Sequence, residues 1–329
     1  MSFLWGELDP SGDGAVPVSP SVKVAIEPAS TDDLRQAVER GGGRLVDASE
    51  AEALVWVDPA NPGGLKDVLE SSPAAWVQLP FAGIESFFAA GAIDAARTWT
   101  CAKGIYGHST AEHALALMLM AARRLNVHAT ATSWTSPRGV GSGFGAAERR
   151  LADCTVVIVG TGGIGSALAA MLQPLRARVI GVNRSGRPLE GAKRTERIGS
   201  LLEVLPEADF VVLALALTPE SRGLIGGAEL AAMPDSAWLV NVARGALVDT
   251  DALVAALAAN RLGGAALDVT DPEPLPEGHP LWGLAVVTPH VANTWDMALP
   301  ELTALVERNV RRFAEGKALE GLVDPASGY

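Results

Sequence analysis

Residues 155–172 read TVVIVGTGGIGSALAAML, and this stretch decides the fold. An apolar run suited to a buried strand leads into a glycine-rich turn, which in turn opens a helical segment. In such a turn Gly160 permits the sharp bend, Gly162 lets a pyrophosphate approach the backbone, and Gly165 lets the helix pack closely on the strand. The helix N-terminus supplies amide donors and a favourable dipole for phosphates. The stretch therefore predicts a dinucleotide-binding unit, with a plain structural turn as the alternative. The candidate cofactor contacts in it are Gly160, Gly162, Gly163, Ile164 and Gly165.

The end of the next predicted strand distinguishes the two nicotinamide cofactors. An acidic residue about twenty residues after the turn would bind the ribose 2′-hydroxyl of NAD. This chain has Asn183 there, followed by Arg184, Ser185 and Arg187. Asparagine does not repel a 2′-phosphate, and Arg184 and Ser185 can hold one. We therefore expect a preference for NADP, with NAD possible; the alternative is that the arginines are solvated loop charges and both cofactors serve.

Three short segments further along the chain carry an arginine, a carboxylate and a histidine: NVARG (241–245), DPEP (271–274) and TPHV (288–291). The planar guanidinium of Arg244 can hold two oxygens at once. His290 can pass a proton near neutral pH, and Glu273 can favour the charged imidazole. Hydride transfer to or from a 2-keto or 2-hydroxy acid requires such a set. The alternatives are a surface arginine, a proline-stiffened loop and a packed histidine.

Packing is the favoured interpretation of the other histidines. These are His108, His113, His128 and His279.

Five segments together resemble the D-isomer-specific 2-hydroxyacid dehydrogenases. NVARGALVD, LDVTDPEPLP and TPHVAN are similar to three successive signatures of that family, STAEHALALML to its interdomain helix, and AGIES to its substrate-loop turn. The resemblance extends from about Val22 to Gly316. It implies that Arg244 binds the substrate carboxylate and keto oxygen, that His290 is the acid/base, and that Glu273 pairs with it.

The resemblance implies further contacts beyond these three. Asp268 would contact the nicotinamide carboxamide, and the backbone of Val242 and Ala243 would approach the cofactor. Backbone amides of the turn after Phe81 would meet the substrate carboxylate: Ala82, Gly83 and Ile84. For Asp268, the alternative is a carboxylate that caps a loop at a strand end. Glu85 stands where the family usually has an aspartate, which leaves the identity of the substrate open.

Short apolar runs alternate with helical segments in two blocks, which predicts two α/β domains with parallel, Rossmann-like or flavodoxin-like sheets. The expected substrate domain is discontinuous, 1–108 plus 296–329, and the expected coenzyme domain is 127–295. A helix over 109–126, with Ser or Thr as its N-cap, should connect them, and the cleft should lie between the domains. Residues 126–150 suggest an irregular arm, through which the resemblance implies a homodimer.

The bulk composition limits the classes of partner. The 329 residues are 48% hydrophobic and 19% charged, with a formal net charge of −12. This balance argues against nucleic acid or an anionic membrane as the main partner. With two cysteines, no zinc-type cluster and no basic N-terminal region before an apolar segment, we expect a cytoplasmic protein without a metal.

Two alternative functions remain at this point. A dinucleotide-sensing co-repressor of the same fold would keep the site residues, whereas a methyltransferase using the glycine turn would leave Arg244, Glu273 and His290 unexplained. Glyoxylate, hydroxypyruvate, phenylpyruvate-like acids and phosphoglycerate are all chemically open as substrates.

Overall fold

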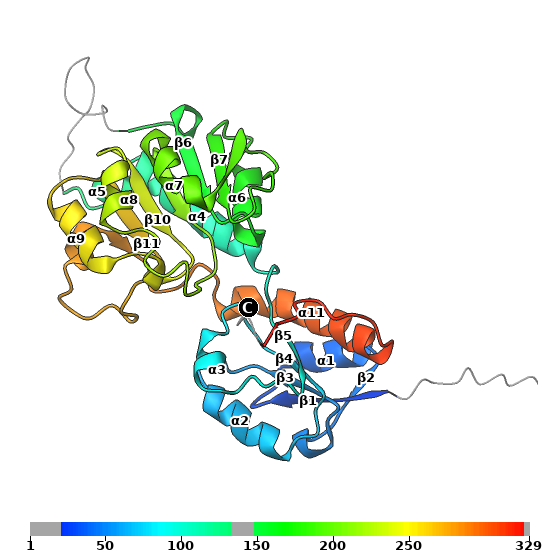
Figure 1. Ribbon diagram of the computed structural model, residues 1–329. Helices are drawn as coiled ribbons and strands as arrows, with labels where there is room; N and C mark the ends of the chain where they lie inside the picture. Colours follow the sequence, from blue (N-terminus) through cyan, green and yellow to red (C-terminus); the bar gives the residue numbers. More distant parts are fainter. Residues whose placement is uncertain (1–20, 133–147, 326–329) are drawn as a thin grey trace, which may run out of the picture. The chain divides into compact units, whose positions relative to one another are not determined.

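The computed structural model describes residues 21–132 and 148–325, which form two compact units (Figure 1). The first unit comprises 21–80, 84–101 and 303–325. The second unit comprises 81–83, 102–132 and 148–302. Both units are parallel-sheet α/β structures, so the predicted fold class is confirmed. Most of the predicted arm, residues 126–150, lies outside the described residues.

The first unit is built on a five-stranded parallel sheet with the order β2-β1-β3-β4-β5. Buried apolar residues of β3 and β4 explain why these short runs form strands in the middle of the sheet. The strands are β1 (Val22–Glu27), β2 (Gly43–Leu45), β3 (Ala53–Trp56), β4 (Trp76–Gln78) and β5 (Thr98–Thr100). The helices between them are α1 (Asp32–Arg40), α2 (Pro62–Ser71) and α3 (Glu85–Ala89).

The C-terminal part of the chain completes this first unit. Helix α11 (Trp295–Ala314) lies beside α1 in Figure 1, where Glu307 accepts from Arg40 at 2.9 Å. Asn309, fully buried, donates to Gln78 Oε1 and to the Glu320 carbonyl, both at 3.0 Å. Beyond the helix, the Gly321 carbonyl accepts from the Cys101 amide at 2.8 Å. The first sheet therefore depends on residues from both ends of the chain.

The second unit contains a seven-stranded parallel sheet with the order β12-β11-β10-β9-β6-β7-β8. The order reverses at β6, from which the chain first proceeds outward to β7 and then returns to β9. Such a switch point is where open α/β sheets bind ligands. The strands are β6 (Thr155–Val159), β7 (Arg178–Asn183), β8 (Arg194–Arg197), β9 (Phe210–Leu213), β10 (Trp238–Asn241), β11 (Gly264–Leu267) and β12 (Val286–Val287). The helices are α4 (Gly107–Ala122), α5 (Leu125–His128), α6 (Gly163–Leu172), α7 (Leu201–Val204), α8 (Gly227–Ala232), α9 (Thr250–Ala258) and α10 (Leu281–Leu284).

The start of α4 differs from the prediction. The helix begins at Gly107, and its N-cap residue, Tyr106, makes no side-chain cap. Ser109 therefore lies inside the first turn rather than at the cap. The early start follows from close packing, because a Cβ on Gly107 would lie 2.8 Å from the Gly163 carbonyl at the start of α6. Glycine at both contacts lets the two helices approach backbone to backbone.

Candidate active site

The glycine turn has the geometry that a dinucleotide requires. Gly160 has a φ of +99°, and a Cβ there would lie 2.3 Å from the Ala214 carbonyl oxygen. A Cβ on Gly165 would lie 2.0 Å from the Gly160 carbonyl, so the helix packs against the turn as predicted. At Gly162 a Cβ would meet nothing within 4 Å. The turn therefore leaves open space at Gly162, before the first amides of α6, where a pyrophosphate fits.

The loop after β7 is shaped by the side chain of Asn183. Its Nδ2 donates to Thr161 Oγ1 and to the Arg187 carbonyl, both at 2.8 Å. Its Oδ1 accepts from the Gly186 amide at 2.6 Å. Asn183 thus joins the loop to the glycine turn and leaves Arg184, Ser185 and Arg187 exposed.

A further arginine, not identified from the sequence, lies beside the same loop. A Cβ on Gly186 would lie 3.1 Å from Cγ of Arg197, on the edge strand β8. Arg197 is exposed, like the loop arginines. The loop after β7 is therefore basic and carries no carboxylate at position 183.

Arg244, Glu273 and His290 follow three adjacent parallel strands. Arg244 comes after β10, Glu273 after β11 and His290 after β12. Because the carboxyl ends of parallel strands lie at the same edge of a sheet, the three loops are neighbours. Gly245 makes the contact close, since a Cβ there would lie 2.0 Å from the Thr270 carbonyl. The sheet therefore gathers the three predicted segments at one edge.

The imidazole of His290 is directly paired. Its Nδ1 lies 2.5 Å from Glu273 Oε1, and the two side chains are 50% and 41% exposed. The Glu273 carboxylate also accepts from the Thr270 amide at 3.4 Å. With Nδ1 committed to the carboxylate, Nε2 is the ring nitrogen left for proton exchange.

Arg244 has an ordered backbone and a half-buried side chain. Asn241, 1% exposed, donates from Nδ2 to the Arg244 carbonyl at 2.8 Å and accepts from the Ala243 amide at 3.1 Å. The guanidinium donates to the Ala243 carbonyl at 2.7 Å. Val242 and Ala243 are buried at this strand end. Asn241 therefore sets the turn that presents Arg244.

Asp268 holds the loop on which His290 lies. Its side chain is 1% exposed, and it accepts from Thr288 Oγ1 at 2.6 Å and from the amides of Val291 and Ala292 at 2.9 and 3.0 Å. Burial disfavours the charged carboxylate, but hydrogen bonds from His113, Thr288 and the two amides outweigh it and lower the pKa of Asp268 to about 2. Asp268 is therefore ionised at neutral pH, and its carboxylate binds the loop that follows β12.

The turn predicted to bind substrate is anchored by aromatic contacts. The Phe81 ring lies 5.7 Å from the Tyr106 ring and 5.9 Å from the Trp295 ring. The Phe81 carbonyl accepts from the Ala102 amide at 3.2 Å. Ala82 and Gly83 are partly exposed, whereas Ile84 is buried at the start of α3.

His113 is not merely packed, which corrects the sequence interpretation. Its Nε2 lies 3.0 Å from Thr288 Oγ1 and 3.4 Å from Asp268 Oδ1. The sequence does contain one indication of this role: His113 and Ser109 are four residues apart, and residues four apart share one face of a helix. His128 also differs from the expectation, since it bonds to Glu148 at 3.0 Å with 41% of its side chain exposed.

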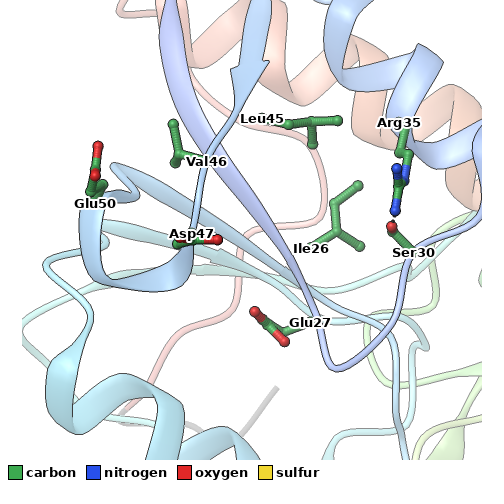
Figure 2. A pocket seen from close by; sticks show the side chains of 8 residues that line it. All are labelled: Ile26, Glu27, Ser30, Arg35, Leu45, Val46, Asp47 and Glu50. Carbon is green, nitrogen blue, oxygen red and sulfur yellow. Dashed lines mark hydrogen bonds between the residues drawn. The ribbon is translucent and has the colours of Figure 1, made fainter.

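A surface hollow of about 460 Å³ in the first unit is separate from these residues (Figure 2). It lies at the ends of β1 and β2 and contains none of the predicted site residues. Glu27, Asp47 and Glu50 line it, and its arginine, Arg35, donates to Ser30 at 2.7 Å. Three carboxylates would repel a 2-keto acid anion, so the hollow is not a candidate for the substrate site.

Within 21–132 and 148–325, no group of three or more histidine, cysteine, aspartate or glutamate side chains is placed to hold a metal. In the same ranges no helix has both the length and the apolar character needed to cross a membrane.

The family model for the NAD binding domain of the D-isomer specific 2-hydroxyacid dehydrogenases matches residues 115–292. The chain therefore belongs to this family and is an NAD(P)-dependent 2-hydroxyacid dehydrogenase. The comparisons do not favour the co-repressor alternative.

Relatives and solved structures agree with this assignment. Glyoxylate reductase of Aeropyrum pernix is 35% identical over 226 residues, 67% of this chain and 68% of that protein. A family member from Xanthobacter autotrophicus, solved with NADPH and MES, has a TM-score of 0.79 at 27% identity and covers 94% of this chain and 100% of its own. The NADPH-dependent glyoxylate/hydroxypyruvate reductase of Sinorhizobium meliloti, solved with NADP and sulfate, has a TM-score of 0.76 at 25% identity, over 94% and 100%.

Proposed function

We propose that the chain reduces a small 2-keto acid to the D-2-hydroxy acid, with NADPH as the preferred cofactor. The observation that carries the proposal is the 2.5 Å contact between His290 Nδ1 and Glu273 Oε1, on loops adjacent to that of Arg244. A carboxylate that favours the imidazolium makes His290 an acid able to protonate a carbonyl oxygen. In the reverse direction the same nitrogen takes the hydroxyl proton.

The other predicted residues complete the site. Arg244 binds the substrate carboxylate and keto oxygen, so that the carbonyl carbon is held in one orientation. The backbone amides of Ala82, Gly83 and Ile84 contact the same carboxylate. The backbone of Val242 and Ala243 approaches the cofactor, as the turn of Gly160, Gly162, Gly163, Ile164 and Gly165 does. The proposal also includes a contact of Asp268 with the nicotinamide carboxamide. The Asp268 side chain is 1% exposed, so the contact requires the carboxamide to reach a buried carboxylate.

The bound nicotinamide cofactor supplies the hydride. The proposed preference for NADP rests on Asn183, which carries no charge, and on the exposed Arg184 and Ser185. Replacing Asn183 by Asp would also remove the donor to Thr161, so Arg184→Ala is the cleaner test. Arg184→Ala should raise the Kd for NADPH by about tenfold with little change for NADH. Arg178→Ala, at the opposite end of β7, is the control. Equal losses for both cofactors would refute the assignment.

The names of the relatives point to glyoxylate and hydroxypyruvate as first substrates to test. The experiment is NADPH oxidation with a panel of 2-keto acids, from glyoxylate to phenylpyruvate, repeated with NADH. We expect the small 2-keto acids of the panel to give the highest kcat/KM. Where the product is chiral, chiral analysis should identify it as the D-2-hydroxy acid. Absence of turnover with every acid, by protein that binds NADPH, would refute the proposal.

We further propose a discontinuous substrate domain (1–108 plus 296–329), a connecting helix (109–126) and a coenzyme domain (127–295). A homodimer formed through the arm at 126–150 and a cytoplasmic location complete the proposal. The buried thiols of Cys101 and Cys154 support a reducing compartment. Sedimentation velocity tests the dimer: a monomer at micromolar concentration would contradict it.

A further inference from the structure

A chain of hydrogen bonds runs from helix α4 to the loop of His290. His113 Nε2 lies 3.0 Å from Thr288 Oγ1, which lies 2.6 Å from Asp268 Oδ1. The Asp268 side chain is 1% exposed and that of His113 is 21% exposed. These contacts join residues that are far apart in sequence but belong to the same unit.

The direction of these bonds follows from counting hydrogens. A carboxylate only accepts, and a threonine hydroxyl has one hydrogen. Thr288 therefore donates that hydrogen to Asp268, and its oxygen is left to accept. Nε2 of His113 must then carry the hydrogen of the 3.0 Å contact. His113 is thus a donor. It restrains the Asp268 carboxylate through Thr288 and also directly, since its Nε2 lies 3.4 Å from Asp268 Oδ1.

Asp268 transmits the restraint to the backbone around His290. Its two carboxylate oxygens accept from the amides of Val291 and Ala292, and its carbonyl accepts from the His290 amide at 2.8 Å. His290 has a φ of +53°, in the left-handed region that non-glycine residues seldom adopt. Such a conformation persists only where surrounding contacts hold it, and here Asp268 provides three of them.

Helix α4 contacts this loop at a second point. Ser109, one turn before His113, has its Oγ 2.8 Å from Asn293 Oδ1. The same helix face therefore reaches the loop on both sides of His290, through Thr288 and through Asn293. This agrees with a role in positioning rather than with packing alone.

We propose that His113 is a positioning residue for the acid/base, acting through Thr288 and Asp268 to hold the loop 288–293. The proposal rests on the proposed role of His290. It requires a hydrogen-bond donor at the place of Nε2, and it does not require the imidazole itself. Glutamine can put an amide N–H near this place, whereas leucine cannot.

The test uses the full-length variants His113→Leu and His113→Gln, with His108→Leu as the control. His108 lies on the same helix but is exposed. His113→Leu should lower kcat for 2-keto acid reduction by about 10- to 100-fold, with the KM for NADPH within about twofold, because misplacement of a reacting group costs this much. His113→Gln should recover most of the loss, and His108→Leu should match the unmodified protein.

Two further measurements separate the possible failures. Hydrogen exchange at the amides of Val291 and Ala292 should be about tenfold faster in His113→Leu and near normal in His113→Gln. This measurement does not depend on enzymatic turnover. In a double-mutant cycle with Thr288→Val, the two losses should be less than additive. If the unmodified protein reduces no 2-keto acid, the proposed function fails, while exchange still tests the positioning. Normal exchange in His113→Leu, or equal losses in the Leu and Gln variants, would overturn the inference.

Discussion

His290 is held at two places. Its ring contacts Glu273, and its backbone amide donates to the Asp268 carbonyl. The two carboxylates have different surroundings. Glu273 is 41% exposed, whereas Asp268 is 1% exposed and surrounded by donors. The exposed Glu273 therefore contacts the ring of His290, and the buried, ionised Asp268 holds the backbone that carries this ring.

Glu273→Gln should lower kcat/KM for ketone reduction by about tenfold or more, because a neutral amide replaces the charged hydrogen-bond partner of the His290 ring. The measurement is kcat/KM with a 2-keto acid and NADPH, with the exposed Glu277→Gln as control. An unchanged kcat/KM would remove Glu273 from the proton chemistry.

Asp268→Asn should destabilise the protein at neutral pH, and the penalty should shrink in acid. The folded pKa of Asp268, about 2, lies below the unfolded value of about 3.9. The folded state thus binds fewer protons, and this stabilisation, on the order of 2 kcal/mol, is complete above pH 4 and is lost as the pH falls towards 2. Urea unfolding at pH 6 and pH 2.5 measures the difference between the two proteins. A penalty independent of pH would contradict the assignment.

At the scale of helices and strands, the three glycines of the turn between β6 and α6 are not equivalent. Gly160 and Gly165 are required by the protein itself, because a side chain at either would overlap neighbouring backbone. Gly162 has no such neighbour, so packing alone does not require glycine there. The motif therefore contains two glycines that the fold requires and one that it does not.

Gly162→Ala and Gly165→Ala should separate these roles. Gly162→Ala should leave the melting temperature within about 2 °C but raise the Kd for NADPH at least tenfold, because a methyl group obstructs the approach of the pyrophosphate. Gly165→Ala should cost about 1–3 kcal/mol through overpacking of α6 on the turn. Thermal melting and cofactor titration of both variants provide the comparison. Equal loss of stability in the two would show that Gly162 is structural.

Strand and helix positions were largely predictable from the sequence, because buried parallel strands are continuous apolar runs. β8 (Arg194–Arg197) has no such run, since its sequence, RTER, is that of a polar edge strand. The arginine, glutamate and histidine were identified by their residue types and local context. His113 was not, because an apolar helix favours packing and its partners lie about 155 and 175 residues further along the chain. Contacts of that range depend on the folded sheet and leave no local pattern.

At the scale of the whole molecule, the first unit depends on its C-terminal segment. Asn309 is fully buried and bonds to Gln78 and to both backbone groups of Glu320. Leucine in its place would remove one of the two donors to Gln78 Oε1 and both side-chain bonds to the Glu320 backbone, and a buried polar group left without its bond costs about 1–3 kcal/mol.

Asn309→Leu should therefore lower the stability of the first unit by about 2–4 kcal/mol while the Kd for NADPH stays unchanged. Calorimetry with and without NADPH provides the measurement, since the ligand should raise the transition of the unit that binds it. Arg308→Ala, which removes an exposed ion pair with Glu320, is the neighbouring control. A weaker affinity for NADPH in Asn309→Leu would contradict the expected independence.

The late strand contacts at Gly321 and Val323 also bear on the order of events during translation. The ribosome delivers β1 early, yet the unit to which β1 belongs lacks its last pieces until residues 321–323 have been made. The nucleotide-binding unit, complete by about residue 302, is available earlier and can be structured while the opening segment still waits. Chains truncated after residue 302 should accordingly be retained on an NADPH affinity resin while their first hundred residues are still cut by protease.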